Sequence, residues 1–194
     1  MIAREVRFVL RWLFGVIAVF YLGTFGYATA RRMIYQKTAE EAFNAETATN
    51  ETATTDPAQI PAGFLGKITV PRLDLSAVIN EGVGDDTLSI AVGHVPGTAL
   101  PGGRGNIALA AHRDTLFRGL KDIQPNDEID LDTVWGAYKY RVKSFKVVEP
   151  TDVEPLRRTD SDVLTLITCY PFDYFGHAPL RFVVEAHEVS ALRK

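Results

Sequence analysis

The sequence contains very little cysteine: Cys169 is the only one in 194 residues. A single thiol cannot form an internal disulfide, so the folded chain must be stabilised by its core alone. The four histidines are scattered along the chain, and one cysteine with scattered histidines does not match the clustered ligands of a zinc site. We therefore expect neither a metal ion nor a cofactor.

The sequence also lacks an excess of positive charge. Its 21 Lys and Arg residues are outnumbered by 24 Asp and Glu, which gives a formal net charge of −3. Domains that bind nucleic acid usually carry a basic patch, so no nucleic acid is expected as a partner. The apolar content of 46% and the charged content of 23% are ordinary for a globular protein. The length allows one domain and an additional segment.

Charge is missing altogether from residues 12–30, WLFGVIAVFYLGTFGYATA. At about 1.5 Å per helical residue, this stretch would cross a hydrocarbon layer of about 30 Å. Three arginines lie in residues 1–11, and Arg31 and Arg32 follow the stretch. The arginine excess before the apolar stretch favours an N-terminus inside the cell. We predict a single-pass anchor in the cytoplasmic membrane, with residues 1–11 as a cytoplasmic tail and the remainder on the extracytoplasmic face.

A cleaved secretory signal is the alternative interpretation, because Ala28-Thr29-Ala30 resembles a peptidase site. The apolar stretch is longer than the usual signal core of about 7–15 residues, which favours an uncleaved anchor. After it, residues 31–60 begin with a few possible helical turns and become rich in Ala, Thr and acidic residues. Apart from Phe43 and Ile60, residues 38–60 have nothing large to bury, so we expect 31–60 to form a solvated stalk or linker.

A different pattern begins near Pro61, with short β-branched and aliphatic runs separated by Pro and Gly. This pattern is typical of a β-barrel or sandwich. One short helix is expected over residues 115–123, TLFRGLKDI. We predict a mostly β domain over residues 61–190 and a short tail over 191–194. The expected strands lie within residues 63–83, 106–112, 127–134, 138–150, 162–169 and 179–189.

Cys169 ends one of these strands, in VLTLITCYPF. A side chain at a strand end is held rigidly and can still face solvent, which suits a nucleophile. Free cysteine is also commonly buried as a small apolar residue. The strand alone leaves these two interpretations equally open.

A cysteine nucleophile needs a partner that controls its protonation. His112 ends the apolar strand NIALAAH, a position that matches that of Cys169 on its own strand. His187 lies in an alternating strand and is expected at the surface. His94 and His177 lie in segments rich in Gly and Pro, where a turn or rim position is expected. Spacing alone does not choose among the four.

Arg181 lies on the polar face of the strand PLRFVVEAHEV. Its guanidinium could simply face solvent. Alternatively, its several N–H donors could hold a developing oxyanion or a substrate carbonyl.

These residues together resemble the signature of the sortases. The segment Thr165–Cys169, T-L-I-T-C, is similar to the sortase pattern T-L-x-T-C, and Arg181 follows twelve residues after the cysteine. His112 lies 57 residues before Cys169, in the order and at the approximate distance that the family uses. Residues 93–120 resemble the sortases of class D in particular. The resemblance covers roughly residues 64–190.

The resemblance implies a closed eight-stranded β-barrel with one or two short helices and a cysteine transpeptidase activity. Cys169 would attack a sorting motif of LPxTx type after its threonine and form a thioester, with His112 as general acid and base and Arg181 on the oxyanion. Further candidates for the substrate pocket are Thr168, Asp114 and His94. The implied partners are secreted proteins that carry the motif and an amine acceptor, either a wall precursor or a protein lysine.

Two other functions remain open. A thiol hydrolase of the same fold would release the acyl group to water, and an anchored binding module would have no activity at all. The joint presence of Cys169, His112 and Arg181 argues against the inactive module. A pilin-polymerising sortase is disfavoured, because Asp56-Pro57-Ala58 lacks the aromatic residue of a lid.

Overall fold

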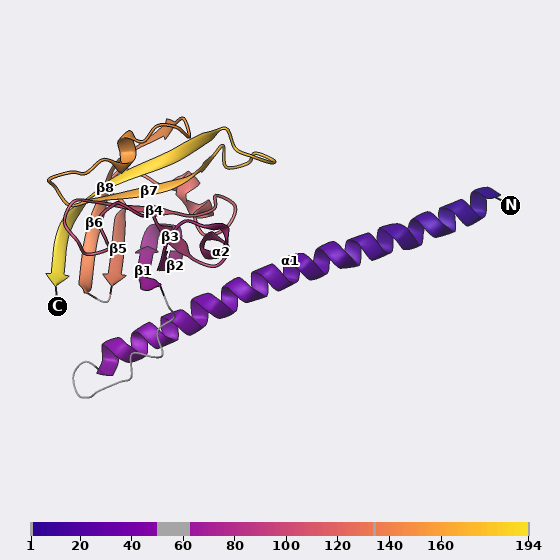
Figure 1. Cartoon of the computed structure of the whole chain (residues 1–194), viewed down its shortest axis with the longest axis horizontal. Helices are drawn as coiled ribbons and strands as arrows, with labels where there is room; N and C mark the ends of the chain where they lie inside the picture. The colour runs from indigo at the N-terminus through magenta and orange to yellow at the C-terminus, as the bar shows by residue number, and fades with distance from the viewer. Residues whose placement is uncertain (1, 50–62, 134, 194) are drawn as a thin grey trace.

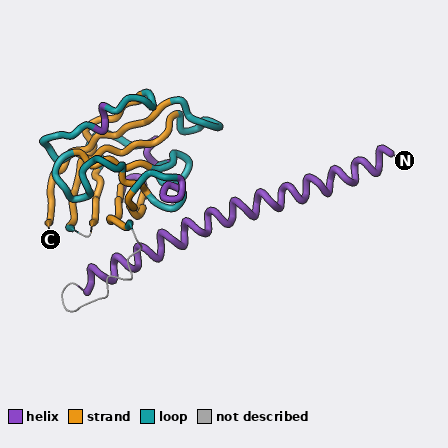
Figure 2. The backbone as a smooth tube through the Cα atoms, viewed as in Figure 1, coloured by secondary structure: helices purple, strands orange, loops and turns teal. Residues whose placement is uncertain are grey.

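The computed structural model of the chain describes residues 2–49, 63–133 and 135–193. It consists of one long helix and a β-barrel that lies beside the C-terminal half of that helix (Figure 1). The barrel is closed, with the strand order β1-β2-β3-β4-β7-β8-β6-β5. Figure 2 shows that loops and short helical turns connect the strands at both ends of the barrel. The expected eight-stranded barrel is confirmed.

The described residues form two α-helices, three 3-10 turns and eight strands. The long helix is α1 (Ile2–Thr49), and α2 (Asp85–Leu88) is a single turn. Three 3-10 turns are η2 (Pro71–Leu73), η3 (Arg118–Asp122) and η4 (Glu154–Leu156). The strands are β1 (Phe64–Val70), β2 (Leu75–Glu81), β3 (Val92–His94), β4 (Asn106–Ala110), β5 (Glu128–Thr133), β6 (Gly136–Val148), β7 (Val163–Tyr170) and β8 (Leu180–Arg193).

Alternate side chains along the strands fill the barrel interior. Leu164 and Leu166 of β7 belong to the main hydrophobic core, as do Phe182 and Val184 of β8. Successive side chains on a strand point to opposite faces, so the odd-numbered residues of both strands face outward. Cys169 and Arg181 therefore lie on the outer face of the barrel wall.

The short helix expected over residues 115–123 is a 3-10 turn, Arg118–Asp122. Two details differ from the sequence prediction. Residues 191–193 are the last part of β8 rather than a tail, because Ala191 and Leu192 pair with β6. The short strand β3 lies where only a loop was expected. Three residues are too few for their alternation to be visible in a sequence.

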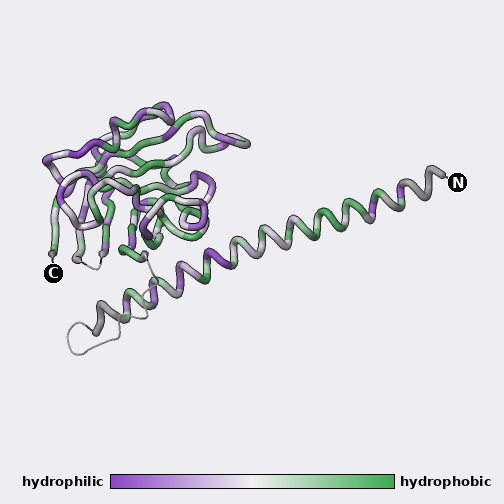
Figure 3. Tube along the Cα trace, in the orientation of Figure 1, coloured by the Kyte–Doolittle hydropathy of each residue, from purple (hydrophilic) through white to green (hydrophobic). Residues whose placement is uncertain are grey.

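The first part of α1 is apolar and exposed. The described residues include one helix long and apolar enough to cross a membrane, over Leu10–Ala45, and none of its apolar window is buried in the structure. Figure 3 shows this apolar stretch in the N-terminal half of α1, beyond the barrel. The helix segment Leu10–Ala45 includes residues 12–30, the predicted anchor.

The C-terminal part of α1 packs on the barrel. Ala39 and Phe43 are buried against Phe64, Val78 and Ala91. The rings of Phe43 and Phe64 lie 5.4 Å apart. These contacts form a second, smaller core between the helix and β1 and β2.

Polar contacts add to this interface. The Gln36 side chain accepts a hydrogen bond from the Val78 backbone N–H at 2.8 Å and donates one to the Ile90 carbonyl at 2.6 Å. Its amide thus joins β2 to the segment before β3. Asn80 donates to the Tyr35 hydroxyl at 2.6 Å, and Lys67 pairs with Glu40.

The expectation of a solvated stalk over 31–60 is wrong for residues 32–43. Helix α1 continues to Thr49, and residues 32–43 contact the barrel. Within residues 38–60 the sequence offered Phe43 as the only large apolar residue before Ile60, and Phe43 is buried in the contact with the barrel. Residues 50–60 lie outside the described part of the chain.

Phe43→Ala is expected to lower the free energy of unfolding by about 3 kcal/mol, because it removes a buried ring and leaves a cavity. Amide hydrogen exchange of β1 and β2 in the full chain, reconstituted in lipid nanodiscs, would measure the loss. Ile34→Ala, at an exposed position of the same helix, is the control and should leave exchange unchanged. Equal effects of the two variants would contradict the packing described here.

Candidate active site

The parallel ladder between β4 and β7 aligns His112 with Cys169. Asn106 pairs with Val163, and the same offset holds to Ala110, which pairs with Ile167. Beyond the ladder, the Ala111 N–H donates to the Ile167 carbonyl at 3.2 Å. The 57 residues that separate His112 from Cys169 therefore equal the offset between paired residues of β4 and β7. If this register is continued two residues past Ala110 and Ile167, His112 lies beside Cys169.

Arg181 reaches the same place through the antiparallel pairing of β7 and β8. Cys169 lies directly opposite Arg181 in this ladder. Opposite residues have Cβ atoms about 4.5–5.5 Å apart, on one face of the sheet. The two pairings bring the three predicted catalytic residues to one end of the barrel, which we call the His112–Cys169 end.

A pocket of about 330 Å³ lies at this end. Its lining includes His112, Cys169 and Arg181 together with Asp114, which confirms their proximity. Cys169 is half-buried and unpaired with another cysteine, whereas His112 is exposed. The remaining lining residues are Arg113, Gly176, His177 and Ala178.

Thr168 does not line this pocket. It is 2% exposed, and its hydroxyl donates to the Ala111 carbonyl at 2.7 Å. Because Thr168 follows the inward-facing residues of β7, its side chain points away from the outer face that carries Cys169. The expected pocket position is thus corrected to a structural one, in which Thr168 holds the backbone directly before His112.

Arg113 ties the β7–β8 loop, residues 171–179, to the segment that carries His112. Its guanidinium donates to the Tyr174 carbonyl at 2.6 Å and to the Gly176 carbonyl at 3.0 Å. Sequence analysis missed this residue, since a contact across 61 positions leaves no local pattern. His177, for which a rim position was expected, is held in the pocket wall by the same loop.

The same loop orients Arg181. One guanidinium nitrogen, Nη1, donates to the Leu180 carbonyl at 3.0 Å and to the Ala178 carbonyl at 3.3 Å. These bonds hold the planar group beside the pocket, where its other N–H groups extend from a fixed position. A guanidinium that is oriented in advance suits the binding of an oxyanion.

His94 is not part of this pocket, which corrects its assignment as a pocket candidate. It is 2% exposed, and its Nδ1 lies 2.8 Å from Glu81 Oε2. Its Nε2 lies 2.9 Å from the Ala99 carbonyl and 3.1 Å from the Thr98 hydroxyl. His94 therefore joins β2, β3 and the following turn. The contacts come from elements that only the folded barrel brings together.

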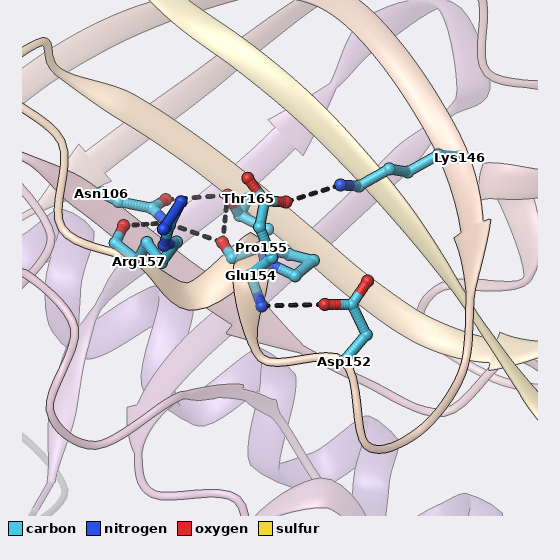
Figure 4. Close-up of polar contacts among 7 residues, drawn as sticks. All are labelled: Asn106, Lys146, Asp152, Glu154, Pro155, Arg157 and Thr165. Carbon is cyan, nitrogen blue, oxygen red and sulfur yellow. Dashed lines mark hydrogen bonds and ion pairs between the residues drawn. The ribbon is translucent and has the colours of Figure 1, made fainter.

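A second pocket, of about 350 Å³, lies further along the same outer wall. It lies under the segment that connects β6 to β7, residues 149–162, which we call the β6–β7 segment. Figure 4 shows how this segment is attached: Asn106 donates to the Pro155 carbonyl at 2.7 Å and accepts from the Thr165 hydroxyl at 2.7 Å. Lys146 pairs with Glu154 at 2.7 Å on the other side. The first threonine of T-L-I-T-C thus holds the wall of a neighbouring pocket.

His187 lines this second pocket, as a half-exposed side chain on β8. Its Nε2 lies 2.8 Å from Glu185 Oε1. This hydrogen bond is the main cause that lowers the pKa of Glu185 below its usual value, with Lys143 contributing. The half-exposed position of His187 agrees with its alternating strand, and its pairing with Val163 places it at the other end of β7 from Cys169.

Thr168→Val is expected to lower the free energy of unfolding by about 1–2 kcal/mol, because the Ala111 carbonyl loses its buried hydrogen-bond donor. Chemical denaturation of the full chain would measure the change. Thr168→Ser retains the hydroxyl and should lose clearly less. If serine and valine were equally destabilising, the hydrogen bond would not be the cause.

The comparison with known proteins agrees with this geometry. Residues 68–189 match the family model of the sortase domain. The chain is 32% identical to Sortase D of Bacillus subtilis over 126 residues, which is 64% of each chain. It is 29% identical to Sortase A of Listeria monocytogenes over 109 residues, or 54% of this chain and 49% of that protein. The chain therefore spans between about half and two thirds of the curated relatives.

Solved structures show the same fold. A Sortase D5 transpeptidase of Clostridium perfringens superposes with a TM-score of 0.64 at 25% identity, over 82% of this chain and 98% of that one. A sortase of Actinomyces oris gives a TM-score of 0.61 at 30% identity, over 68% and 83%. The resemblance to class D is supported by the match to Sortase D of Bacillus subtilis. By sequence, fold and the residues at the His112–Cys169 end, the chain belongs to the sortase family.

Proposed function

We propose that this sortase is a cysteine transpeptidase that cleaves an LPxTx-like motif after its threonine and transfers the acyl group to an amine. The observation that supports it most strongly is the alignment of His112, Cys169 and Arg181 by two adjacent strand ladders. A nucleophile, a proton carrier and an oxyanion donor then share one pocket. An inactive binding module would have no need for this set.

In the first step, the Cys169 thiolate attacks the threonine carbonyl carbon, and the carbonyl oxygen becomes an oxyanion beside Arg181. The C–N bond then breaks, and the departing nitrogen takes a proton from the His112 imidazolium. The products are a thioester on Cys169 and a free amine. Arg181 acts where negative charge develops, so it stabilises the transition state more than the bound substrate.

In the second step, the acceptor amine attacks the thioester carbonyl and gives its proton to His112. The C–S bond breaks and the Cys169 thiolate is restored, while the acyl group leaves as a new amide. The exposed position of His112 supports this exchange, because the two amines must enter and leave beside it. The acceptor is an amine of a wall precursor or of a protein lysine.

The outer wall of the barrel supports an extended peptide as substrate. Thr165, Ile167 and Cys169 share this face of β7, and Thr165 borders the second pocket. At about 3.3 Å per residue, Thr165 and Cys169 are about 13 Å apart, the length of about four extended residues. Residues of the motif before its threonine would thus lie along β7 toward the second pocket.

The location proposed for this reaction is the outer face of the cytoplasmic membrane. Residues 12–30 would anchor the chain, with residues 1–11 inside the cell. The uncharged stretch and the three arginines before it support this orientation, while Arg31 and Arg32 after it weaken the charge asymmetry. The substrates would be secreted proteins that carry the motif.

Substitution of each of the three proposed catalytic residues is expected to lower turnover by a different factor. Cys169→Ala should abolish turnover, and His112→Ala should lower it by about 10²–10⁴-fold, since proton transfer commonly contributes that much. Arg181→Ala should lower kcat by about 10²–10³-fold, a typical loss for an oxyanion donor. Initial rates of peptide cleavage would measure these changes. Arg118→Ala, at an exposed arginine that lines neither pocket, is the matched control, and full turnover in Cys169→Ala would refute the mechanism.

The mass of the intact protein distinguishes the possible activities. The full chain in detergent is incubated with LPxTG-, LPxTA- and LAxTG-type peptides, with and without a small amine. We expect an acyl adduct on Cys169 that the amine discharges as a peptide–amine conjugate. An adduct lost only to water would favour the hydrolase. No adduct from any of the three peptides, with Cys169 still open to alkylation, would contradict the proposed specificity.

A further inference from the structure

The strand ladders define which elements lie at the His112–Cys169 end of the barrel. Strands β4 and β7 are parallel and both finish there. Because β3 is antiparallel to β4, and β2 is parallel to β3, both begin at this end. Strand β1 is antiparallel to β2, so it begins at the opposite end, at Phe64, and finishes at the His112–Cys169 end.

The contacts of α1 run along the barrel in a corresponding order. Phe43 packs on Phe64, at the start of β1, and Glu40 pairs with Lys67, three residues further along β1. Arg32 Nε then donates to the Ser89 carbonyl at 3.1 Å, in the turn before β3 begins. From residue 43 to residue 32, α1 therefore passes from the opposite end of the barrel to the His112–Cys169 end.

The uncharged stretch 12–30 continues α1 in the same direction. Arg31 and Arg32 end this stretch, so they would lie at the level of the lipid headgroups. Since Arg32 contacts Ser89, the His112–Cys169 end lies close to that level. Figure 1 shows the β7–β8 loop extending from the barrel on the side where the N-terminal half of α1 leaves it.

This loop exposes two aromatic side chains at its tip. Phe175 is 99% exposed and Tyr174 is 47% exposed. The base of the loop is packed, because the rings of Phe172 and Phe182 lie 5.3 Å apart. On the other side, Arg113 binds the carbonyls of Tyr174 and Gly176. The loop is thus held at its base and by Arg113, while residues 173–177 are exposed.

We propose that Tyr174 and Phe175 insert into the interfacial region of the bilayer that α1 spans, as a second membrane contact beside the active-site pocket. Aromatic side chains prefer this region of a membrane, where their rings lie at headgroup level. The contact rests on the anchored topology under Proposed function. It brings the pocket to the membrane surface, where substrates that are themselves attached to the membrane would meet Cys169.

Site-directed spin labelling of the full chain in lipid nanodiscs tests this contact. Cys169→Ala removes the only native thiol, so Phe175→Cys then carries a single nitroxide. Compared with a label at Leu192, the label at Phe175 is expected to be less accessible to a water-soluble nickel complex and more accessible to oxygen. Leu192→Cys is the matched control: Leu192 is apolar and 78% exposed, and it lies on β8 at the opposite end of the barrel. Its label should remain accessible to nickel.

A third label, Val19→Cys, reports on the anchor itself. If Val19 is protected and Phe175 is as accessible to nickel as Leu192, the loop does not touch the membrane, and only this inference is overturned. If Val19 is also accessible to nickel, both the anchor and the loop contact are refuted. Protection of Val19 and Phe175, but not of Leu192, supports the contact. Since Phe175 is exposed, its substitution should leave the fold intact.

Discussion

The parallel pairing of β4 with β7 is the interaction on which the candidate site depends. It carries one constant register from Asn106 and Val163 to the ends of both strands. Thr168 extends it by one side-chain hydrogen bond to the Ala111 carbonyl. A shift by one residue would move every side chain of β7 to the other face of the wall. Cys169 would then point into the core, and Leu166 would face solvent.

The same short motif therefore serves both the fold and the chemistry. Leu166 packs in the barrel interior, Thr165 attaches the β6–β7 segment through Asn106, and Thr168 supports the residue before His112. Cys169 is the one polar side chain of the motif directed into the pocket. Because these roles lie on alternate faces of one strand, a change at one position is felt on the opposite side of the wall.

Under the proposed anchoring, the interface between α1 and the barrel gives the barrel a defined relation to the membrane. A flexible stalk would let the pocket face any direction, whereas the contacts of Gln36 and Phe43 hold the barrel against a helix that continues into the apolar stretch. The pocket end and the apolar half of α1 then lie on the same side. Orientation, as well as tethering, would limit which substrates reach Cys169.

The sequence by itself determined the apolar stretch 12–30, the alternating strands and the position of Cys169 at a strand end, because these depend on local periodicity and charge. It also led to His112 and Arg181, through a family motif with a characteristic spacing. Only the tertiary structure decided that His94 is buried beside Glu81, that Thr168 faces inward, and that Arg113 holds the β7–β8 loop. These contacts join residues far apart in the chain, whose partners are set by strand register and barrel closure rather than by neighbouring residues.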